Sequence, residues 1–151
     1  PPESRFEMTK LLEEKNIKAS DFEIRYNKSS ITIDTIEMLD KKYPEHKFAW
    51  ITGSDKLKDF QKYDRWKDLV YKHNLIIFPR EHMLWHLEER VKEAFQVDAV
   101  PENISVLNNN DLVLTNISST LVRERVRKGL SILHLVTEGV EEYIQKNGLY
   151  K

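Results

Sequence analysis

The sequence has no cysteine among its 151 residues, which excludes disulfide bonds and thiolate metal sites and fits a reducing compartment. It also has no apolar run near the roughly 20 residues that a membrane span needs, and no signal-like segment. The net charge is only −1, so nucleic acids and anionic membranes meet no bulk attraction. We therefore expect a soluble, cytoplasmic protein that binds any phosphate through a local cluster of groups.

Common catalytic motifs are missing as well. The sequence contains no G-x-S-x-G, no Walker-type GK[ST] and no G-x-G-x-x-G, which removes the commoner hydrolase, P-loop and dinucleotide-dehydrogenase interpretations. We find no internal repeat and no low-complexity linker. With 40% apolar and 10% aromatic residues, the chain has enough apolar side chains to form the core of one domain, residues 1–151.

Strand-like and helix-like segments alternate along the chain, which predicts α/β layers around a mainly parallel sheet. We expect strands at Asp21–Tyr26, Lys47–Thr52, Asn74–Pro79, "ISVL" and "DLVL". The expected helices are an early one in "PPESRFEMTKLLEEKNI", then "ITIDTIEMLDKKY", a short "DKLKDF", a longer "RWKDLVYKH", "MLWHLEERVKEAFQ", Ser119–Lys128 and Glu138–Lys146. The early helix begins almost at once and without an initiator Met, so we expect the chain to be part of a longer protein.

The strongest candidate for phosphate binding is "NISSTLVRERVRKG", which follows the strand "DLVL". A helix N-terminus binds anions through free N–H groups and its positive dipole end, and Ser118, Ser119 and Thr120 add hydroxyl donors there. Arg123 lies one turn further and can fold back toward the same anion. Alternatively, one serine is a plain N-cap. We interpret Arg125 as a solvated side chain, and Arg127 and Lys128 as complements of the C-terminal dipole.

A second candidate site is the turn Gly53-Ser54-Asp55, directly after the strand "FAWIT". Gly53 permits close approach of a ligand, and Asp55 either accepts from ribose hydroxyls or caps the next helix. An aromatic such as Tyr63 either stacks on a flat heterocycle or packs in the core. Thr32 lies at a helix start, where simple capping explains it equally well.

Among five histidines, His82 and His86 form the one pair at i,i+4 spacing. The intervening residues contain no acid and no third ligand is evident, so we interpret the pair as incidental and predict no metal site.

Several stretches resemble the bacterial-type nicotinate-nucleotide adenylyltransferases in the same order. They are "SSITIDT", "FAWITGSDKLKDFQKY", "NLIIFPR" and "ISSTLVRERVRKGLSILHLVTEGVEEYIQKNGLY", with "PPESRFEMTKL" similar to an early helix of the family. The resemblance implies a Rossmann-like nucleotidyltransferase fold and transfer of AMP from ATP to nicotinate mononucleotide in NAD biosynthesis, with Mg²⁺ accompanying ATP. It further implies that Ser118, Ser119, Thr120 and Arg123 hold ATP phosphates, that Gly53 and Asp55 line its ribose, and that Thr32 and Tyr63 surround the mononucleotide.

The sequence departs from the family pattern in ways that keep alternatives open. The family's G-x-F-x-P-x-H-x-x-H segment, whose histidines neutralise the α-phosphate, does not occur, so we expect these residues alone to be inactive. Asp64 stands where the family usually has Tyr, and Thr137 replaces a Pro. An acid beside the pyridine pocket would repel a nicotinate carboxylate, which leaves nicotinamide mononucleotide possible. The further alternatives are a sister nucleotidyltransferase with another acceptor and a non-catalytic nucleotide-binding module.

Overall fold

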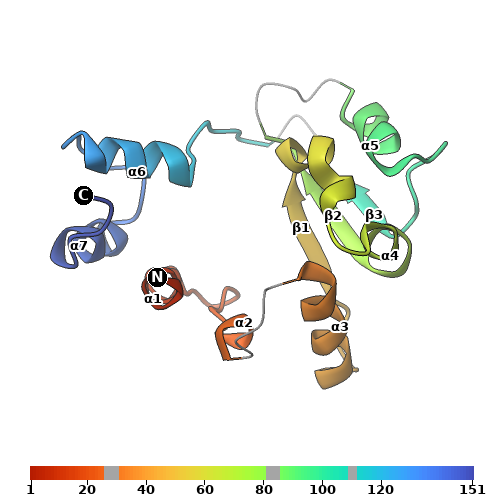
Figure 1. Ribbon diagram of the computed structural model, residues 1–151, viewed down its shortest axis with the longest axis horizontal. Helices are drawn as coiled ribbons and strands as arrows, with labels where there is room; N and C mark the ends of the chain where they lie inside the picture. The colour runs from red at the N-terminus through yellow and green to blue at the C-terminus, as the bar shows by residue number, and fades with distance from the viewer. Residues whose placement is uncertain (26–30, 81–85, 109–111) are drawn as a thin grey trace. The chain divides into compact units, whose positions relative to one another are not determined.

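In the computed structural model, the chain divides into two compact units. The structure describes residues 1–25, 31–80, 86–108 and 112–151. One unit is formed by residues 1–28 and 117–151, and the other by the intervening residues 29–116 (Figure 1). The expected single domain, residues 1–151, stays a prediction.

The unit of residues 29–116 is built on a parallel sheet of three strands. These are β1 (Ala49–Gly53), β2 (Asn74–Phe78) and β3 (Ile104–Val106), in the order β1-β2-β3 (Figure 1). Ile51 pairs with Ile76 in the register of β1 and β2, and Ile76 pairs with Ser105 of β3. The predicted parallel α/β architecture is therefore confirmed.

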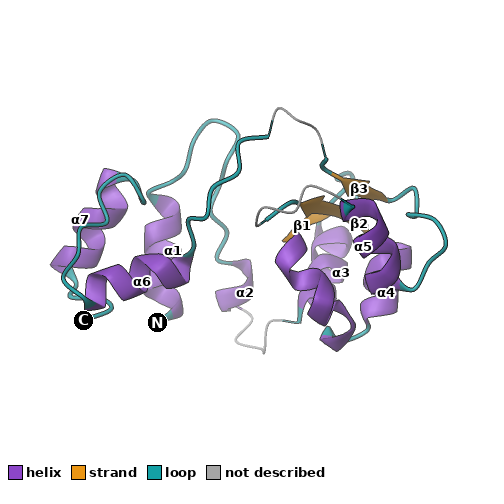
Figure 2. Cartoon of the chain, turned by 90° about the horizontal axis from the view of Figure 1, so that it is seen from above, coloured by secondary structure: helices purple, strands orange, loops and turns teal. Residues whose placement is uncertain are grey.

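The core lies on one face of this sheet. Along β2 the side chains alternate, with Leu75 and Ile77 fully buried, while on β1 Ile51 is 64% exposed. The helices of the unit are α3 (Thr32–Lys42), the 3₁₀-helix η1 (Ser54–Lys62), α4 (Trp66–Lys72) and α5 (Leu87–Phe95), and α3 and α4 lie below the sheet in Figure 2. Their buried side chains complete the core: Ile33, Ile36, Leu57, Phe60, Leu69, Val70, Leu87, Val91 and Phe95.

An ion-pair network links α3 to the start of α4. Arg65, whose φ of 50° lies in the left-handed region, donates two hydrogen bonds to the Glu37 carboxylate at 2.6 and 3.1 Å and a third to Asp68. The Arg65 guanidinium holds the pKa of Glu37 below its ordinary value of 4.5. Because these side chains are exposed, the network contributes only a small part of the stability.

This network predicts a pH-dependent contribution to stability. A lowered pKa means that Glu37 stabilises the fold fully at neutral pH, and that this contribution disappears as the pH falls below 4.5 through the lowered pKa. We expect Glu37→Gln to lower the melting temperature by a few degrees at pH 7 and by less at pH 3. Thermal unfolding at both pH values, with Glu45→Gln as the control, measures this; an equal effect at both would show that the pair contributes nothing.

The unit formed by both ends of the chain is helical. It contains α1 (Pro2–Lys10), α2 (Phe22–Arg25), α6 (Ser119–Arg127) and α7 (Glu138–Lys146). Its core is small and consists of Val122, Ile132, Val140 and Ile144, with Met8 of α1 packed against it. Gly129 and Gly148 follow α6 and α7 with φ of 64° and 58°, the left-handed conformation that glycine commonly adopts just after a helix.

Two predicted strands are wrong over their described residues. In Asp21–Tyr26, residues 22–25 form the single helical turn α2, and Tyr26 lies outside the described residues. Asp21 and Arg25 explain the helix, because their side chains pair at 2.6 Å with i,i+4 spacing while the Arg25 amide donates to the Asp21 carbonyl. In "DLVL", residues 112–114 form no regular structure, and Val113 is 86% exposed.

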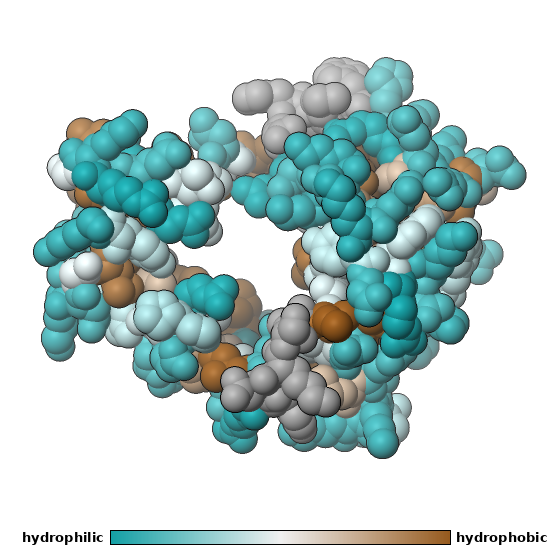
Figure 3. All heavy atoms as spheres, in the orientation of Figure 1, coloured by the Kyte–Doolittle hydropathy of each residue, from teal (hydrophilic) through white to brown (hydrophobic). Residues whose placement is uncertain are grey.

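The visible surface is largely hydrophilic, with apolar side chains dispersed among polar ones (Figure 3). None of the helices in the described ranges is both long and apolar enough to cross a membrane.

Candidate functional site

The turn at the carboxyl end of β1 is fastened to the end of β2 by Ser54. Its buried Oγ accepts from the Arg80 amide at 2.8 Å and donates to the Arg80 carbonyl at 3.1 Å. The sheet therefore places Gly53, Asp55 and Arg80 together at its carboxyl edge, where ligands of parallel α/β sheets bind. No individual role was predicted for Ser54 or Arg80; the available signal was that Ser54 lies in the turn after one predicted strand and that Arg80 follows the terminal Pro79 of the next.

Asp55 carries an unpaired oxygen in this turn. Its Oδ1 is buried and has no hydrogen-bond partner, and the Arg80 Nε is 4.0 Å away. The 3₁₀-helix η1 has no side-chain cap, so the interpretation of Asp55 as a cap is wrong. A buried carboxylate oxygen without a donor calls for a partner, and a ligand hydroxyl would be one.

Gly53 lies directly against the side chains of Asp55 and Arg80. A Cβ there would contact Asp55 Oδ1 and would lie 2.6 Å from the Arg80 Cδ. Any larger residue at this position would therefore have to displace both side chains.

We expect Gly53→Ala to weaken ATP binding about tenfold while leaving the fold intact. The added methyl displaces the Asp55 carboxylate, and losing one hydrogen bond to a charged group costs roughly 1.5–3 kcal/mol, which is about tenfold or more in affinity. Titration calorimetry with ATP on the intact protein measures the effect. The matched control is Gly139→Ala on α7, where a Cβ meets its nearest atom, of Leu11, at 3.8 Å; an unchanged affinity in Gly53→Ala would show that this turn does not touch ATP.

The two predicted mononucleotide residues lie in the same unit. Thr32 is the first residue of α3, half-buried beside the core residue Ile33. Tyr63 is half-buried at the end of η1, with its ring 5.2 Å from Trp50 and 5.3 Å from Phe60 between centroids. Core packing thus accounts for these contacts of the Tyr63 ring. The stacking of Tyr63 on the mononucleotide stays a prediction.

The start of α6 gathers the other predicted residues. Ser118 is the N-cap, and its Oγ accepts from the Leu121 amide at 3.1 Å. By helix geometry the amides of Ser119 and Thr120 have no acceptor within α6, and both residues are exposed. The Arg123 Nη2 donates to the Thr120 Oγ1 at 3.3 Å, so Arg123 folds back toward the helix start as predicted.

Arg123 makes no ion pair with any carboxylate that the structure describes, so its charge at the start of α6 is not neutralised. Arg125 differs from the expected solvated side chain, since its Nε donates to the Ser131 carbonyl at 2.7 Å and ties down the chain after α6. Amides without an acceptor in the helix, hydroxyls and a guanidinium without a carboxylate partner are the groups that bind anions in proteins.

Of the predicted histidine pair, His86 is exposed just before α5, and His82 lies outside the described residues. In the described part of the chain, no three His, Asp or Glu side chains are close enough together to hold a metal ion.

The parallel three-stranded sheet with its helices is the architecture of a Rossmann-like α/β nucleotidyltransferase. A family model described as cytidylyltransferase-like matches residues 1–125. The chain belongs to this family and, within it, to the nicotinate-nucleotide adenylyltransferases.

Individual relatives carry this assignment. The chain is 37% identical to a probable nicotinate-nucleotide adenylyltransferase of Caldicellulosiruptor saccharolyticus, over 99% of this chain and 74% of that protein. It is 31% identical to a counterpart in Flavobacterium johnsoniae, over 89% of this chain and 64% of that protein. Among solved structures, nicotinic acid mononucleotide adenylyltransferase of Plasmodium falciparum complexed with NaAD matches with a TM-score of 0.63 at 23% identity, over 83% of this chain and 59% of that one, which supports the fold.

Proposed function

We propose that the full-length protein transfers AMP from ATP to nicotinate mononucleotide, giving deamido-NAD and pyrophosphate in NAD biosynthesis. The observation that carries this proposal is the start of α6, where unpaired amides meet the unneutralised Arg123 in a chain of this family. The relatives' names supply the acceptor, and a Plasmodium relative is described in complex with NaAD.

The reaction needs little covalent help from the protein. A phosphate oxygen of the mononucleotide attacks the α-phosphorus of ATP, and the bond to the β-phosphate oxygen breaks as pyrophosphate leaves. Catalysis then consists of positioning the reactants and stabilising charge on the phosphate oxygens. We assign the ATP phosphates to Ser118, Ser119, Thr120 and Arg123, and the mononucleotide to Thr32 and Tyr63.

The ribose of ATP is assigned to the turn after β1. The unpaired Asp55 Oδ1 accepts a hydrogen bond from a ribose hydroxyl, and Gly53 lets the sugar approach the backbone. Mg²⁺ enters with ATP and is held mainly by the phosphates and water, as is usual for this ion. There it supplies positive charge that offsets charge on the phosphate oxygens.

The histidine motif of the family does not occur in residues 1–151. We therefore propose that these residues alone bind nucleotide without measurable turnover. The cysteine-free composition supports a cytoplasmic location for the enzyme.

The test is pyrophosphate release by the intact protein with ATP and a panel of acceptors. Turnover on nicotinate mononucleotide at least about tenfold above the other acceptors supports the proposal. Faster turnover on nicotinamide mononucleotide would show that this compound is the acceptor instead. The exposed acid Asp64 beside Tyr63 is consistent with that outcome, because it would repel a nicotinate carboxylate. Turnover only on a different acceptor would indicate a sister nucleotidyltransferase, and ATP binding without turnover on any acceptor would indicate a non-catalytic module.

A further inference from the structure

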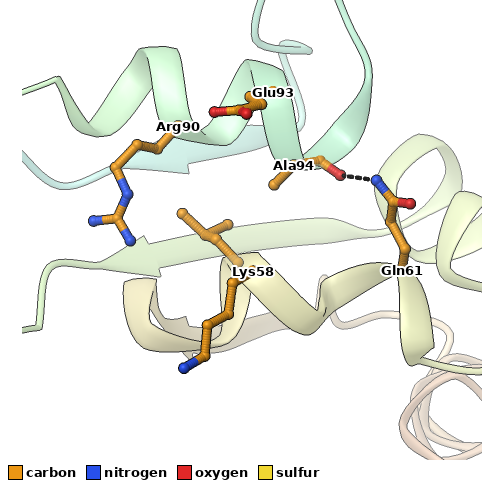
Figure 4. Close-up of a pocket in the computed structure, with 6 residues that line it drawn as sticks. Lys58, Gln61, Arg90, Glu93 and Ala94 are labelled. Atoms are coloured by element: carbon orange, nitrogen blue, oxygen red, sulfur yellow. Dashed lines mark hydrogen bonds between the residues drawn. The ribbon is translucent and has the colours of Figure 1, made fainter.

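A cavity of about 350 Å³ lies between η1 and α5 (Figure 4). It is within the size range of small-molecule sites in proteins. It includes none of the residues to which the proposed function assigns ATP or the mononucleotide. Six residues line it: Leu57, Lys58 and Gln61 from η1, and Arg90, Glu93 and Ala94 from α5.

Arg90 brings an unsatisfied donor to this cavity. Its Nη1 is buried and has no hydrogen-bond partner, although the residue as a whole is only half-buried. The side chain extends from α5 toward η1 (Figure 4), and no carboxylate that the structure describes pairs with it. A buried guanidinium N–H without an acceptor costs free energy, and an anion in the cavity would supply the acceptor.

The other walls are fixed by packing and hydrogen bonding. Leu57 is 3% exposed and contributes an apolar part of the lining. The Gln61 Nε2 donates to the Ala94 carbonyl at 3.1 Å, which joins η1 to α5 at the end of the cavity away from the Arg90 guanidinium (Figure 4). These contacts hold the walls of the cavity in place, which lowers the entropic cost of binding.

The charges lining the cavity select the kind of ligand. Arg90 and the exposed Lys58 supply two positive charges, and Glu93 supplies one negative charge. We propose that this cavity binds a small molecule through an oxyanion group, a phosphate or a carboxylate, with Arg90 as the principal contact. A guanidinium offers paired N–H donors that match two oxygens of either group, and Glu93 disfavours ligands with more negative charge.

The experiment is an NMR titration of the intact ¹⁵N-labelled protein with inorganic phosphate and, separately, with acetate. We expect saturable shifts of the Gln61 side-chain amide and of the Ala94 backbone amide. Arg90→Gln should weaken this binding at least about tenfold, as expected for losing a charge-assisted hydrogen bond. Arg90→Lys, which keeps the charge but not the paired donors, should give an intermediate affinity.

The matched control is Lys92→Gln, which removes a cation from the same helix at a position that does not line the cavity; its affinity should stay within about twofold. Shifts that saturate with only one of the two anions would identify the group that is recognised. Shifts that grow linearly without saturation, or an affinity that is the same in Arg90→Gln as in the unmodified protein, would overturn the proposal. Arg90 would then contribute only packing through the aliphatic part of its side chain. Phosphate bound at the start of α6 is distinguished by shifts of Ser119 and Thr120, which are independent of Arg90.

Discussion

Replacing Arg123 with alanine is expected to weaken ATP binding by the intact protein about 10- to 100-fold, since each hydrogen bond to a charged group contributes roughly 1.5–3 kcal/mol. The guanidinium is already turned toward the start of α6 by its bond to Thr120. It therefore needs little reorganisation to reach a phosphate. Its loss removes both the positive charge and the oriented N–H donors.

The control for this prediction is Arg127→Ala on the same helix. Arg127 is exposed in the last turn, where a cation only complements the helix dipole, so ATP affinity should change less than twofold. Titration calorimetry with ATP compares the two variants, and Arg123→Lys should fall between them because it retains charge without bidentate donors. Equal small effects at both positions would mean that Arg123 is an ordinary surface residue.

Replacing Phe60 with alanine is expected to destabilise the unit of residues 29–116 by about 3–5 kcal/mol, the usual cost of truncating a buried phenylalanine. Phe60 is 0% exposed, and its ring centroid lies 4.6 Å from that of Phe95 on α5 and 5.8 Å from that of Trp50 on β1. Its removal would leave a cavity among the sheet, η1 and α5. Tyr63, which packs on the same ring, would lose its support.

Chemical denaturation followed by tryptophan fluorescence measures this loss. Tyr71→Ala provides an aromatic control on the same unit, because Tyr71 is 58% exposed and its removal should cost no more than about 0.5 kcal/mol. If Phe60→Ala unfolded at the same denaturant concentration as Tyr71→Ala, the packing of η1 against α5 would not be a main source of stability.

Much of the architecture was predictable because the strongest patterns are local. The continuous apolar run "NLIIFP" predicts β2, and the i,i+3 spacing of Ile33 and Ile36 predicts α3; the structure confirms both elements. α7 is confirmed at the predicted bounds, and α6 ends at Arg127, one residue before the predicted Lys128. The predicted helix "MLWHLEERVKEAFQ" is confirmed over Leu87–Phe95, and its earlier residues lie partly outside the described ranges.

The mistakes arise where a specific interaction, local or tertiary, outweighs the apolar pattern of the segment. The alternation in "DFEIR" predicts a strand, but the Asp21–Arg25 ion pair closes a helical turn instead. The helix at "DKLKDF" was expected to be shorter than the one after it, but the structure shows the opposite. The first, η1, spans Ser54–Lys62, whereas the second, α4, spans only Trp66–Lys72. Packing against α5 extends η1, and this could not be deduced from the segment itself.

In the candidate site, too, local features were predictable and long-range ones were not. Ser118 as N-cap and the return of Arg123 toward the helix start follow from spacing alone, and both geometries are found. The double hydrogen bond between Ser54 and Arg80 joins residues 26 positions apart, so no local pattern predicts it. The unpaired Asp55 Oδ1 and Arg90 Nη1 depend on burial, which only the folded chain defines.

The helical unit is formed by two segments from opposite ends of the chain, so it can fold only after the last residues have been synthesised. Residues 29–116 are contiguous and can complete their contacts as soon as they have left the ribosome, whereas Met8 must wait for Val140 and Ile144 to be synthesised. Closing so long a loop costs conformational entropy, which favours prior folding of the inserted sheet unit because it shortens the effective loop. The start of α6, to which we assign the ATP phosphates, therefore belongs to the part of the chain that folds last, so an incomplete nascent chain has a formed sheet but lacks the proposed phosphate site.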